Sequence, residues 1–327
     1  MYCDVAFLEG IFKNMSSSSS YKVAYVILEK LSDIVLSMTE SEILQKAQAN
    51  PMFKKLFKKE HGTIIGQPDW HSQVDFQNVA DEVFFVTGST EQKCDDMRQK
   101  YGCLWVSEST LNVLDKLKQK YGYSLIPLKK QVLPGKNNTW KEVLGQVTIE
   151  PVNAAILVDN YMCSTITRFE ERKRENLFEI LRKIVPNSLE IPFHLTLVLE
   201  NGGGKITTKI AQQWIAEIKG LNLCKSMCVT VVAHTTKDVT HERVILTNYH
   251  VFGSDKGFGI VFHGKADEIT SGEIKSVFDS IDDCLGETTK QQHFQRISWI
   301  KQMYHEIAQR PSSVIFLEGD KQNRLID

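Results

Sequence analysis

Strand-length apolar runs alternate with amphipathic helical patterns along most of this 327-residue chain. The apolar runs include DIVLS, VFFVTG and CLWVS in the first part, and NAAILVD, FHLTLVLE and CVTVVAH in the second. Between them lie segments such as TESEILQKAQANPMFKKLFKK and KITTKIAQQWIAEIKG, in which apolar residues recur at helical spacing. Strands that alternate with helices form mostly parallel sheets with helices on both faces, so the sequence predicts an α/β fold.

Turn-forming residues divide this pattern into two blocks. A chain of 327 residues is long enough for two domains of common size. The segment 126–150 contains Pro127, Pro134 and the sequence PGKNN, which indicates a connector with a short helix inside it. We therefore expect two three-layer α/β domains with mostly parallel sheets, one at 1–125 and one at 151–327.

Charge and hydropathy narrow the classes of function. The 39 basic and 40 acidic side chains leave a formal net charge of −1, so contact with nucleic acid would need a local basic patch. The apolar runs are shorter than the roughly 20 residues that span a bilayer, and the N-terminus lacks the basic segment of a signal peptide. Seven cysteines without a regular spacing favour reduced thiols. These features predict a cytoplasmic protein without a transmembrane segment.

Acidic side chains follow or open several elements of the first block. Asp4 ends the first apolar run, Glu42 lies in the first turn of a helix, and Asp75 precedes the strand VFFVTG, which Ser89 follows. In a parallel sheet, the carboxyl ends of the strands and the starts of the following helices meet at one edge. Carboxylate oxygens gathered there suit Mg²⁺ or Mn²⁺, which activate water and stabilise phosphoryl transfer. Acids are also typical helix N-cap and first-turn residues, so a structural role stays open.

The order of these elements resembles that of PIN-like nuclease domains. MYCDVAFL, VLSMTESEIL, ADEVFFVTGS and YGCLWVSEST are similar to that family's opening strand, its strand and acidic helix, and its last two strands. The resemblance covers roughly residues 1–120. It implies a metal-dependent ribonuclease with Asp4, Glu42 and Asp75 as catalytic metal ligands and Ser89 near the phosphate. The family usually has an acid where Ser89 stands, and Asn where Ala6 stands, so a weakened cation site is expected.

A polar trio marks the stretch THERVILTNYHVFGSDKGFGIVF in the second block, residues 240–262. His241 and Arg243 are two positions apart on a predicted strand, so their side chains would share one face. Asn248 follows that strand, and the strand GFGIVFHG is expected to pair after the turn GSDKG. An imidazole, a guanidinium and an amide can gather around a phosphate, and they can equally form an ordinary polar edge of a sheet.

The same trio, spaced H-x-R-x4-N, resembles the H-x-K-x4-D signature of the phospholipase D superfamily. The surrounding strands, over about residues 150–305, are similar to the phospholipase-D-like C-terminal domain of MIT-domain proteins. The resemblance implies that His241 is the catalytic nucleophile and that Arg243 and Asn248 bind phosphate. Arg stays charged and donates a proton poorly, and one such set stands where a phosphodiesterase of this type uses two. This departure favours binding over hydrolysis.

Two hypotheses follow. In the first, the protein is associated with nucleic acid, by analogy in a prokaryotic defence system, and combines a PIN-like metal-dependent nuclease domain with a degenerate phospholipase-D-like domain. In the second, it is a non-catalytic adaptor or sensor that binds an anionic ligand or a partner protein, alone or as a homo-oligomer. One cation within reach of Asp4, Glu42 and Asp75 would favour the enzyme, and acids that point apart would favour the adaptor.

Overall fold

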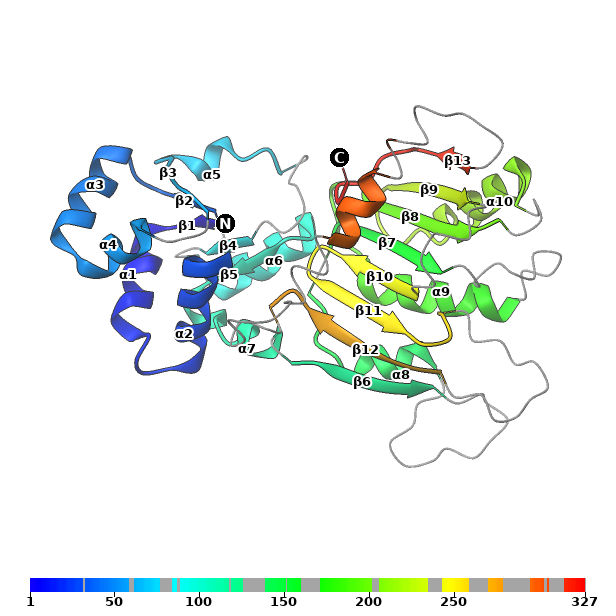
Figure 1. Ribbon diagram of the computed structural model, residues 1–327, viewed down its shortest axis with the longest axis horizontal. Coiled ribbons are helices and arrows are strands. Elements are labelled where there is room, and N and C mark those ends of the chain that lie inside the picture. Colours follow the sequence, from blue (N-terminus) through cyan, green and yellow to red (C-terminus); the bar gives the residue numbers. More distant parts are fainter. Residues whose placement is uncertain are drawn as a thin grey trace.

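The structure contains two β-sheets, which lie at opposite ends of the long axis in Figure 1. One has five strands in the order β3-β2-β1-β4-β5, and the other has eight in the order β13-β9-β8-β7-β10-β11-β12-β6. This computed structural model describes residues 1–31, 33–58, 62–76, 84–86, 89–117, 119–125, 139–150, 152–159, 171–201, 206–234, 243–258, 270–278, 295–302, 305 and 315–326.

The first sheet uses short strands joined by helices. Its strands are β1 (Tyr2–Cys3), β2 (Ile34–Leu36), β3 (Ile64–Gly66), β4 (Phe84–Val86) and β5 (Leu104–Val106). The helices of this part are α1 (Val5–Asn14), α2 (Ser19–Val26), α3 (Glu40–Ala49), α4 (Pro51–Phe57), α5 (Trp70–Gln73), α6 (Glu91–Tyr101) and α7 (Val113–Leu117), with a π-helical turn η1 (Ile27–Leu31) and a 3-10 turn η3 (Glu108–Thr110).

The described pairings of this sheet are all parallel, which confirms the expected strand direction for the first block. Alternate side chains point to opposite faces, because the side-chain period of a strand is two residues. Cys3 and Leu36 join one hydrophobic cluster, and Tyr2, Val35 and Trp105 join another that contains Trp70 of α5. Each face of the sheet is therefore covered by hydrophobic side chains.

The second sheet has longer strands. They are β6 (Tyr121–Leu125), β7 (Ala154–Asp159), β8 (Phe193–Glu200), β9 (Met227–His234), β10 (Arg243–Thr247), β11 (His250–Ser254), β12 (Thr270–Ser276) and β13 (Ile315–Gly319). The helices of this part are α8 (Trp140–Gly145), α9 (Glu171–Ile184) and α10 (Thr208–Lys219), with a further helix at 295–302. No helix in the described ranges combines the length and the apolar character needed to cross a bilayer.

The α/β class is confirmed, but the expectation of a mostly parallel sheet is wrong for the second block. β7, β8 and β9 run parallel to one another, whereas β10, β11, β12, β6 and β13 each pair antiparallel with their neighbours. For β10 and β11 the reason is local, since the two-residue connection between them can join only antiparallel strands. The neighbours of β10 are β11, with the sequence HVFGS, and β7. Most of the expected strand GFGIVFHG lies outside the described residues.

Two segments expected outside the second domain contribute to its sheet and core. β6 lies within the range 1–125 but pairs with β12. α8 is the short helix expected in the connector 126–150, and its Trp140 is fully buried and donates to the carbonyl of Phe258 at 3.1 Å. One hydrophobic cluster also includes residues of both sheets, Leu104 and Leu157 among them. The two blocks therefore share one hydrophobic core.

The join between the two sheets depends on the end of α6. Gly102 terminates this helix in the left-handed conformation, with φ 60°. A Cβ added there would lie 2.5 Å from the carbonyl carbon of Val152, just before β7. Nearby, the backbone N–H of Leu104 donates to the hydroxyl of Tyr249 at 2.7 Å. Glycine at position 102 thus satisfies both the helix stop and the close approach of the two parts.

The two faces of the second sheet are covered by different elements. α9 and α10 contribute Leu177, Ile180 and Trp214 to the cluster on one face. On the other face, Ile297 and Ile300 of the helix 295–302, drawn in orange in Figure 1, pack with side chains of β7 and β10. Arg296, on the same helix, lines a cavity over β10, β11 and β12 on this second face.

Candidate functional site

Asp4 lies at the carboxyl end of β1, the central strand of the first sheet. It is the N-cap residue of α1, and its side chain is 19% exposed. Its Oδ1 is 2.7 Å from Nε2 of His71, and the His71 ring stacks on Trp70 with a centroid distance of 3.6 Å. The carboxylate therefore contacts an imidazole from α5. His71 lies in the short helix α5, and no local sequence pattern links it to Asp4.

Glu42 takes part in the start of α3. Its carboxylate accepts from the backbone N–H of Thr39 at 2.7 Å, and its own N–H donates to the Thr39 hydroxyl at 3.3 Å. This reciprocal pair is a capping box. The hydrogen bonds from the Thr39 backbone and side chain lower the pKa of Glu42. The structure thus gives Glu42 the helix-starting role that the sequence left open.

Two further residues were predicted for the first site. Asp75 is exposed, just after α5, and Ser89 is half-buried, just before α6. Within the described ranges, no group of three or more His, Cys, Asp or Glu side chains is placed to hold a metal ion. The structure therefore does not bring Asp4, Glu42 and Asp75 together as a set of ligands for Mg²⁺ or Mn²⁺.

Two polar residues at the same edge were missed. The hydroxyl of Ser37, which follows β2, accepts from the backbone N–H of Val5 at 3.1 Å. The carboxylate of Glu108, which follows β5, accepts from the hydroxyl of Tyr21. The rule that selected Asp4 applies equally to these residues, since each follows an apolar strand of a parallel sheet.

The polar trio of the second block is not gathered at one point. Arg243 is the first residue of β10 and pairs in register with Asp159, at the carboxyl end of β7. Asn248 follows the last residue of β10, so about 16 Å of strand separates the two backbones at roughly 3.3 Å per residue. His241 lies outside the described residues. The structure therefore separates the two described members of the proposed phosphate site.

Asn248 is completely buried and bonded within the fold. Its side-chain oxygen accepts from the backbone N–H groups of Asn153 and Ala154 at 3.0 and 3.1 Å, and its Nδ2 donates to Oδ1 of Asn153 at 3.0 Å. This amide ties the turn between β10 and β11 to the start of β7. These hydrogen bonds satisfy the side-chain amide, which allows a polar residue to be fully buried at this turn.

Asp159 also organises the region around Arg243. It is 1% exposed, and its Oδ2 accepts from the backbone N–H of Phe258 at 2.8 Å. The preceding Gly257 has φ 95°, and a Cβ added there would lie 2.6 Å from the same Oδ2. The loop after β11 can approach the carboxylate only because residue 257 has no side chain.

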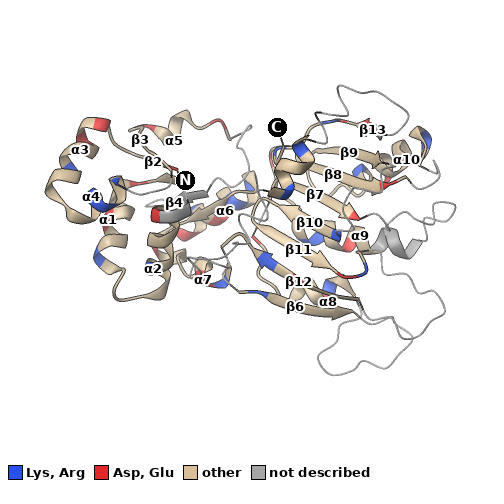
Figure 2. Ribbon diagram, viewed as in Figure 1, with Lys and Arg blue, Asp and Glu red and all other residues tan. Residues whose placement is uncertain are grey.

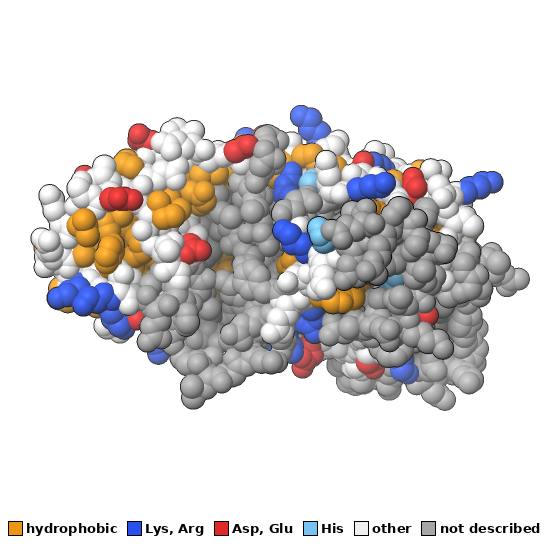
Figure 3. Space-filling view, turned by 45° about the horizontal axis from the view of Figure 1, so that its top comes forward, with side chains coloured by type: hydrophobic (Ala, Val, Ile, Leu, Met, Phe, Trp, Pro, Cys, Tyr) orange, Lys and Arg blue, Asp and Glu red, His pale blue; other side chains and the backbone are white. Residues whose placement is uncertain are grey.

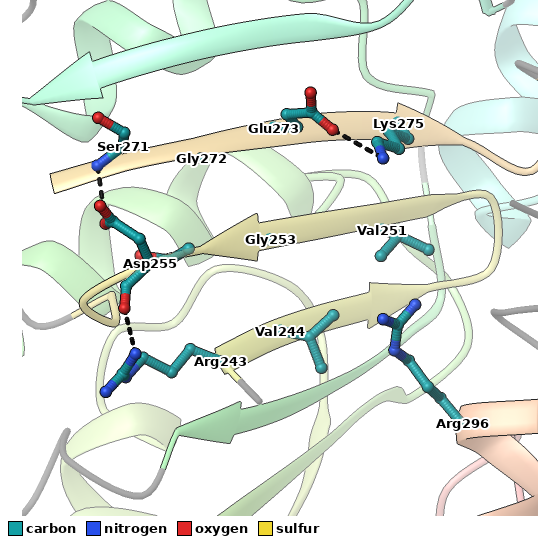
Figure 4. A pocket seen from close by; sticks show the side chains of 11 residues that line it. Arg243, Val244, Val251, Gly253, Asp255, Ser271, Gly272, Glu273, Lys275 and Arg296 are labelled. Carbon is teal, nitrogen blue, oxygen red and sulfur yellow. Dashed lines mark hydrogen bonds and ion pairs between the residues drawn. The ribbon is translucent and has the colours of Figure 1, made fainter. Parts of the chain in front are cut away.

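Arg243 lines an open cavity of about 600 Å³ over β10, β11 and β12, here called the Arg243 pocket (Figure 4). Its basic lining residues come from three elements: Arg243 from β10, Lys275 from β12 and Arg296 from the helix 295–302. Figure 4 shows Arg296 extending from that helix toward Val244 and Val251. The sequence could not show that these three basic residues, which come from distant segments, line one cavity.

The acidic side chains of the pocket are engaged by the protein itself. Oδ1 of Asp255 accepts from the backbone N–H of Ser271 at 2.8 Å, and the Asp255 carbonyl accepts from Arg243. Glu273 forms an ion pair with Lys275 at 2.7 Å. The hydrogen bond from Lys275 lowers the pKa of Glu273, so this carboxylate stays charged over a wide pH range.

Charge and apolar surface are distributed differently over the molecule. Basic and acidic residues are interspersed over both parts in Figure 2, in line with the net charge of −1. The exposed large hydrophobic side chains are Leu44, Phe57 and Ile65, on α3, α4 and β3. Figure 3 shows hydrophobic side chains gathered at the end of the molecule where these elements lie in Figure 1. The basic pocket and this apolar area are on different parts of the chain.

Comparison with protein-family models and with curated proteins finds no match to this chain.

Proposed function

We propose that the protein is a binding protein, an adaptor or sensor, that holds a phosphate-bearing ligand in the Arg243 pocket. The observation that carries the proposal is the convergence of Arg243, Lys275 and Arg296 on one cavity. Its volume of about 600 Å³ lies in the range of small-molecule sites, roughly 300 to 1,000 Å³. A nucleotide has dimensions that suit such a cavity.

The chemistry of the lining favours an anion. Two of the three basic groups are guanidinium groups, which present several N–H donors in a planar fork that matches phosphate oxygens. The Arg243 contact to Asp255 uses a backbone carbonyl, which carries no formal charge. Val244 and Val251 add apolar surface against which a sugar or base can lie. The pocket thus offers one part to a phosphate and another to the group attached to it.

Nucleic acid is the ligand source that we favour, since the first block resembles PIN-like nuclease domains. Binding without hydrolysis is supported by the location of Asn248, whose amide is used in the interior of the fold. It is also supported by Arg243 itself, because a guanidinium remains charged and is a poor general acid. A cytoplasmic, nucleic-acid-associated role, as in prokaryotic defence, is part of this proposal.

The test is equilibrium binding of fluorescent single-stranded RNA and DNA, with a nucleoside monophosphate as competitor. We expect Arg296→Gln to weaken binding about tenfold, because it removes a charge-assisted contact. Lys301→Gln is the matched control, since it changes the same charge at an exposed position of the same helix. Equal affinities of the parent and both variants would place the ligand elsewhere, and no binding by the parent would refute the proposal.

A metal-dependent nuclease is a second candidate, favoured by the position of Asp4 at the carboxyl end of the central parallel strand. Ser37 follows β2, which adjoins β1, and Glu108 follows β5, which adjoins β4, at the same edge of the sheet. Labelled RNA and DNA should then be cut in the presence of Mn²⁺ by the parent and by Asp96→Ala, which removes an exposed acid of α6, but not by Asp4→Ala. If the parent cuts neither nucleic acid, this candidate fails and the binding proposal is unaffected.

A further inference from the structure

A second and smaller cavity lies where the first part of the chain meets the second sheet. It has a volume of about 70 Å³ and is here called the junction cavity. One side is formed by the end of α7 with Lys116, by the residues before β6 with Lys120, and by Gln146 and Thr148 after α8. The other side is formed by the start of β11 and the end of β12.

The junction cavity has a buried polar floor and a basic mouth. His250 and Ser276, which are 2% exposed and face each other in the β11–β12 register, lie at the floor beside Ile274. Lys116 and Lys120 are exposed at the mouth. The imidazole of His250 carries at least one N–H donor in either protonation state, and the serine hydroxyl can also donate.

The lining of this cavity is rich in lysine, and carboxylates lie nearby: Lys116 interacts electrostatically with Glu150, and Lys120 with Glu273. Three lysines, Lys116, Lys120 and Lys275, line it, and the described lining residues include no carboxylate. Lys275 has an acidic partner, Glu273, but that residue belongs to the lining of the Arg243 pocket and not of this cavity. Lys116 and Lys120 are exposed and can draw an anion toward the buried donors of His250 and Ser276.

We infer that the junction cavity binds one phosphate group. A volume of about 70 Å³ is roughly twice the ~30 Å³ that a water molecule occupies in the liquid. That space accommodates a single small oxyanion and excludes a sugar or a base. Lysine ammonium groups at the mouth and N–H or O–H donors at the floor suit a tetrahedral oxyanion. A free phosphate and a terminal phosphomonoester share this chemistry. An internal phosphodiester carries groups on two of its oxygens, and the cavity would have to accommodate both.

This site is separate from the pocket of the proposed function. The Arg243 pocket contains Arg243 and Arg296, and neither lines the junction cavity. Lys275 lines both, so its substitution would not discriminate between them. Lys116 and Lys120 line only the junction cavity, which makes them the residues to change.

The experiment is calorimetric titration of the whole protein with inorganic phosphate at constant ionic strength. We expect the double variant Lys116→Gln with Lys120→Gln to bind phosphate about tenfold more weakly than the parent, since two charged donors are lost. The control is Lys54→Gln with Lys58→Gln, which removes the same charge from exposed positions at α4. It should bind like the parent, and so should Arg296→Gln.

Three outcomes would overturn the inference. They are an absence of phosphate binding by the parent, equal binding by the two double variants, and loss of binding in Arg296→Gln alone. Thermal unfolding of each variant establishes that it is folded, and the exposed positions of the four lysines make this expected. Competition with short oligonucleotides distinguishes the sources. A 5′-phosphorylated strand that displaces phosphate, with no effect of the 5′-hydroxyl strand, identifies a terminal phosphomonoester, and failure of both identifies free phosphate.

Discussion

Asn248 and Asn153 hold each other through side-chain and backbone groups in the protein interior. Nδ2 of Asn248 donates to Oδ1 of Asn153, and Oδ1 of Asn248 accepts from the Asn153 backbone N–H, both at 3.0 Å. Nδ2 of Asn153 in turn donates to the carbonyl of Tyr101, the last residue of α6, at 3.0 Å. A chain of amides thus runs from the β10–β11 turn to the first part of the molecule.

Substitution of Asn248 should therefore reduce stability more than it reduces ligand binding. Asn248→Ala leaves two buried backbone N–H groups without their acceptor, and each such group costs about 1 to 3 kcal/mol. We expect the free energy of unfolding to fall by roughly 3 kcal/mol in urea denaturation. Asn112→Ala, at an exposed position, is the control and should change it little. A stable Asn248→Ala variant that had lost only phosphate affinity would contradict this.

Gly257 should not tolerate a side chain. Its φ of 95° is unfavourable for other residues, and an added Cβ would meet the Asp159 carboxylate at 2.6 Å. We expect Gly257→Ala to lower the free energy of unfolding by about 2 kcal/mol. Gly145 is the comparison, because a Cβ added there meets no atom within 4 Å. If both substitutions have the same effect on the unfolding midpoint, the contact with Asp159 is not what constrains position 257.

His194 should make stability dependent on pH. Burial, followed by the positive charge of Arg324, lowers the pKa of His194 from 6.5 to about 4. Below its ordinary pKa the unfolded chain binds a proton that the folded chain does not, so stability is full above about pH 6.5 and falls as the pH drops toward 4. After allowance for solvent screening, the loss between neutral pH and about pH 5 should be about 1 kcal/mol.

His194→Asn provides the measurement. Nδ1 of His194 accepts from the backbone N–H of Arg324 at 3.1 Å, and the asparagine oxygen can take that place. Urea denaturation near neutral pH and at mildly acidic pH should show a smaller change for the variant than for the parent. Identical pH dependence in the two proteins would exclude His194 as the cause.

Substitutions in the capping box of α3 distinguish a structural role of Glu42 from a catalytic role. Thr39→Ala should lower the free energy of unfolding by about 1 kcal/mol, since it removes the N-cap acceptor. Glu42→Gln should lower it much less than Thr39→Ala does, because glutamine can also complete a capping box. If Glu42→Gln instead abolished Mn²⁺-dependent cleavage while stability was kept, the carboxylate would be acting at a metal.

Local signals in the sequence predicted much of the fold. Thr39 and Glu42 have the residue types and spacing of a capping box and form one, and Gly220, a residue type common after helix ends, directly follows α10. The first sheet has the predicted parallel strands. Helix caps and strand periodicity depend on neighbouring residues, so they can be recognised without knowledge of the rest of the chain.

The residues that come together in the candidate sites could not be predicted from such local signals. The sequence placed Arg243 and Asn248 in one site, but a strand separates them by its full length. Arg296 and Lys275 join Arg243 from segments distant in sequence, and His71 meets Asp4 across 67 residues. No local pattern specifies such contacts, because they arise only when separate elements pack.

The sequence by itself determined the α/β class, the parallel direction of the first sheet and the caps of its helices, because these features depend on short-range periodicity and hydrogen bonding. The tertiary structure decided that the second sheet is mixed, that β6 joins it, and that basic side chains converge on two cavities. Strand direction in that sheet depends on a turn at Asn248 whose amide is satisfied by β7. The buried amide needs hydrogen-bond partners from a strand that is distant in sequence, and a local sequence pattern does not specify that strand.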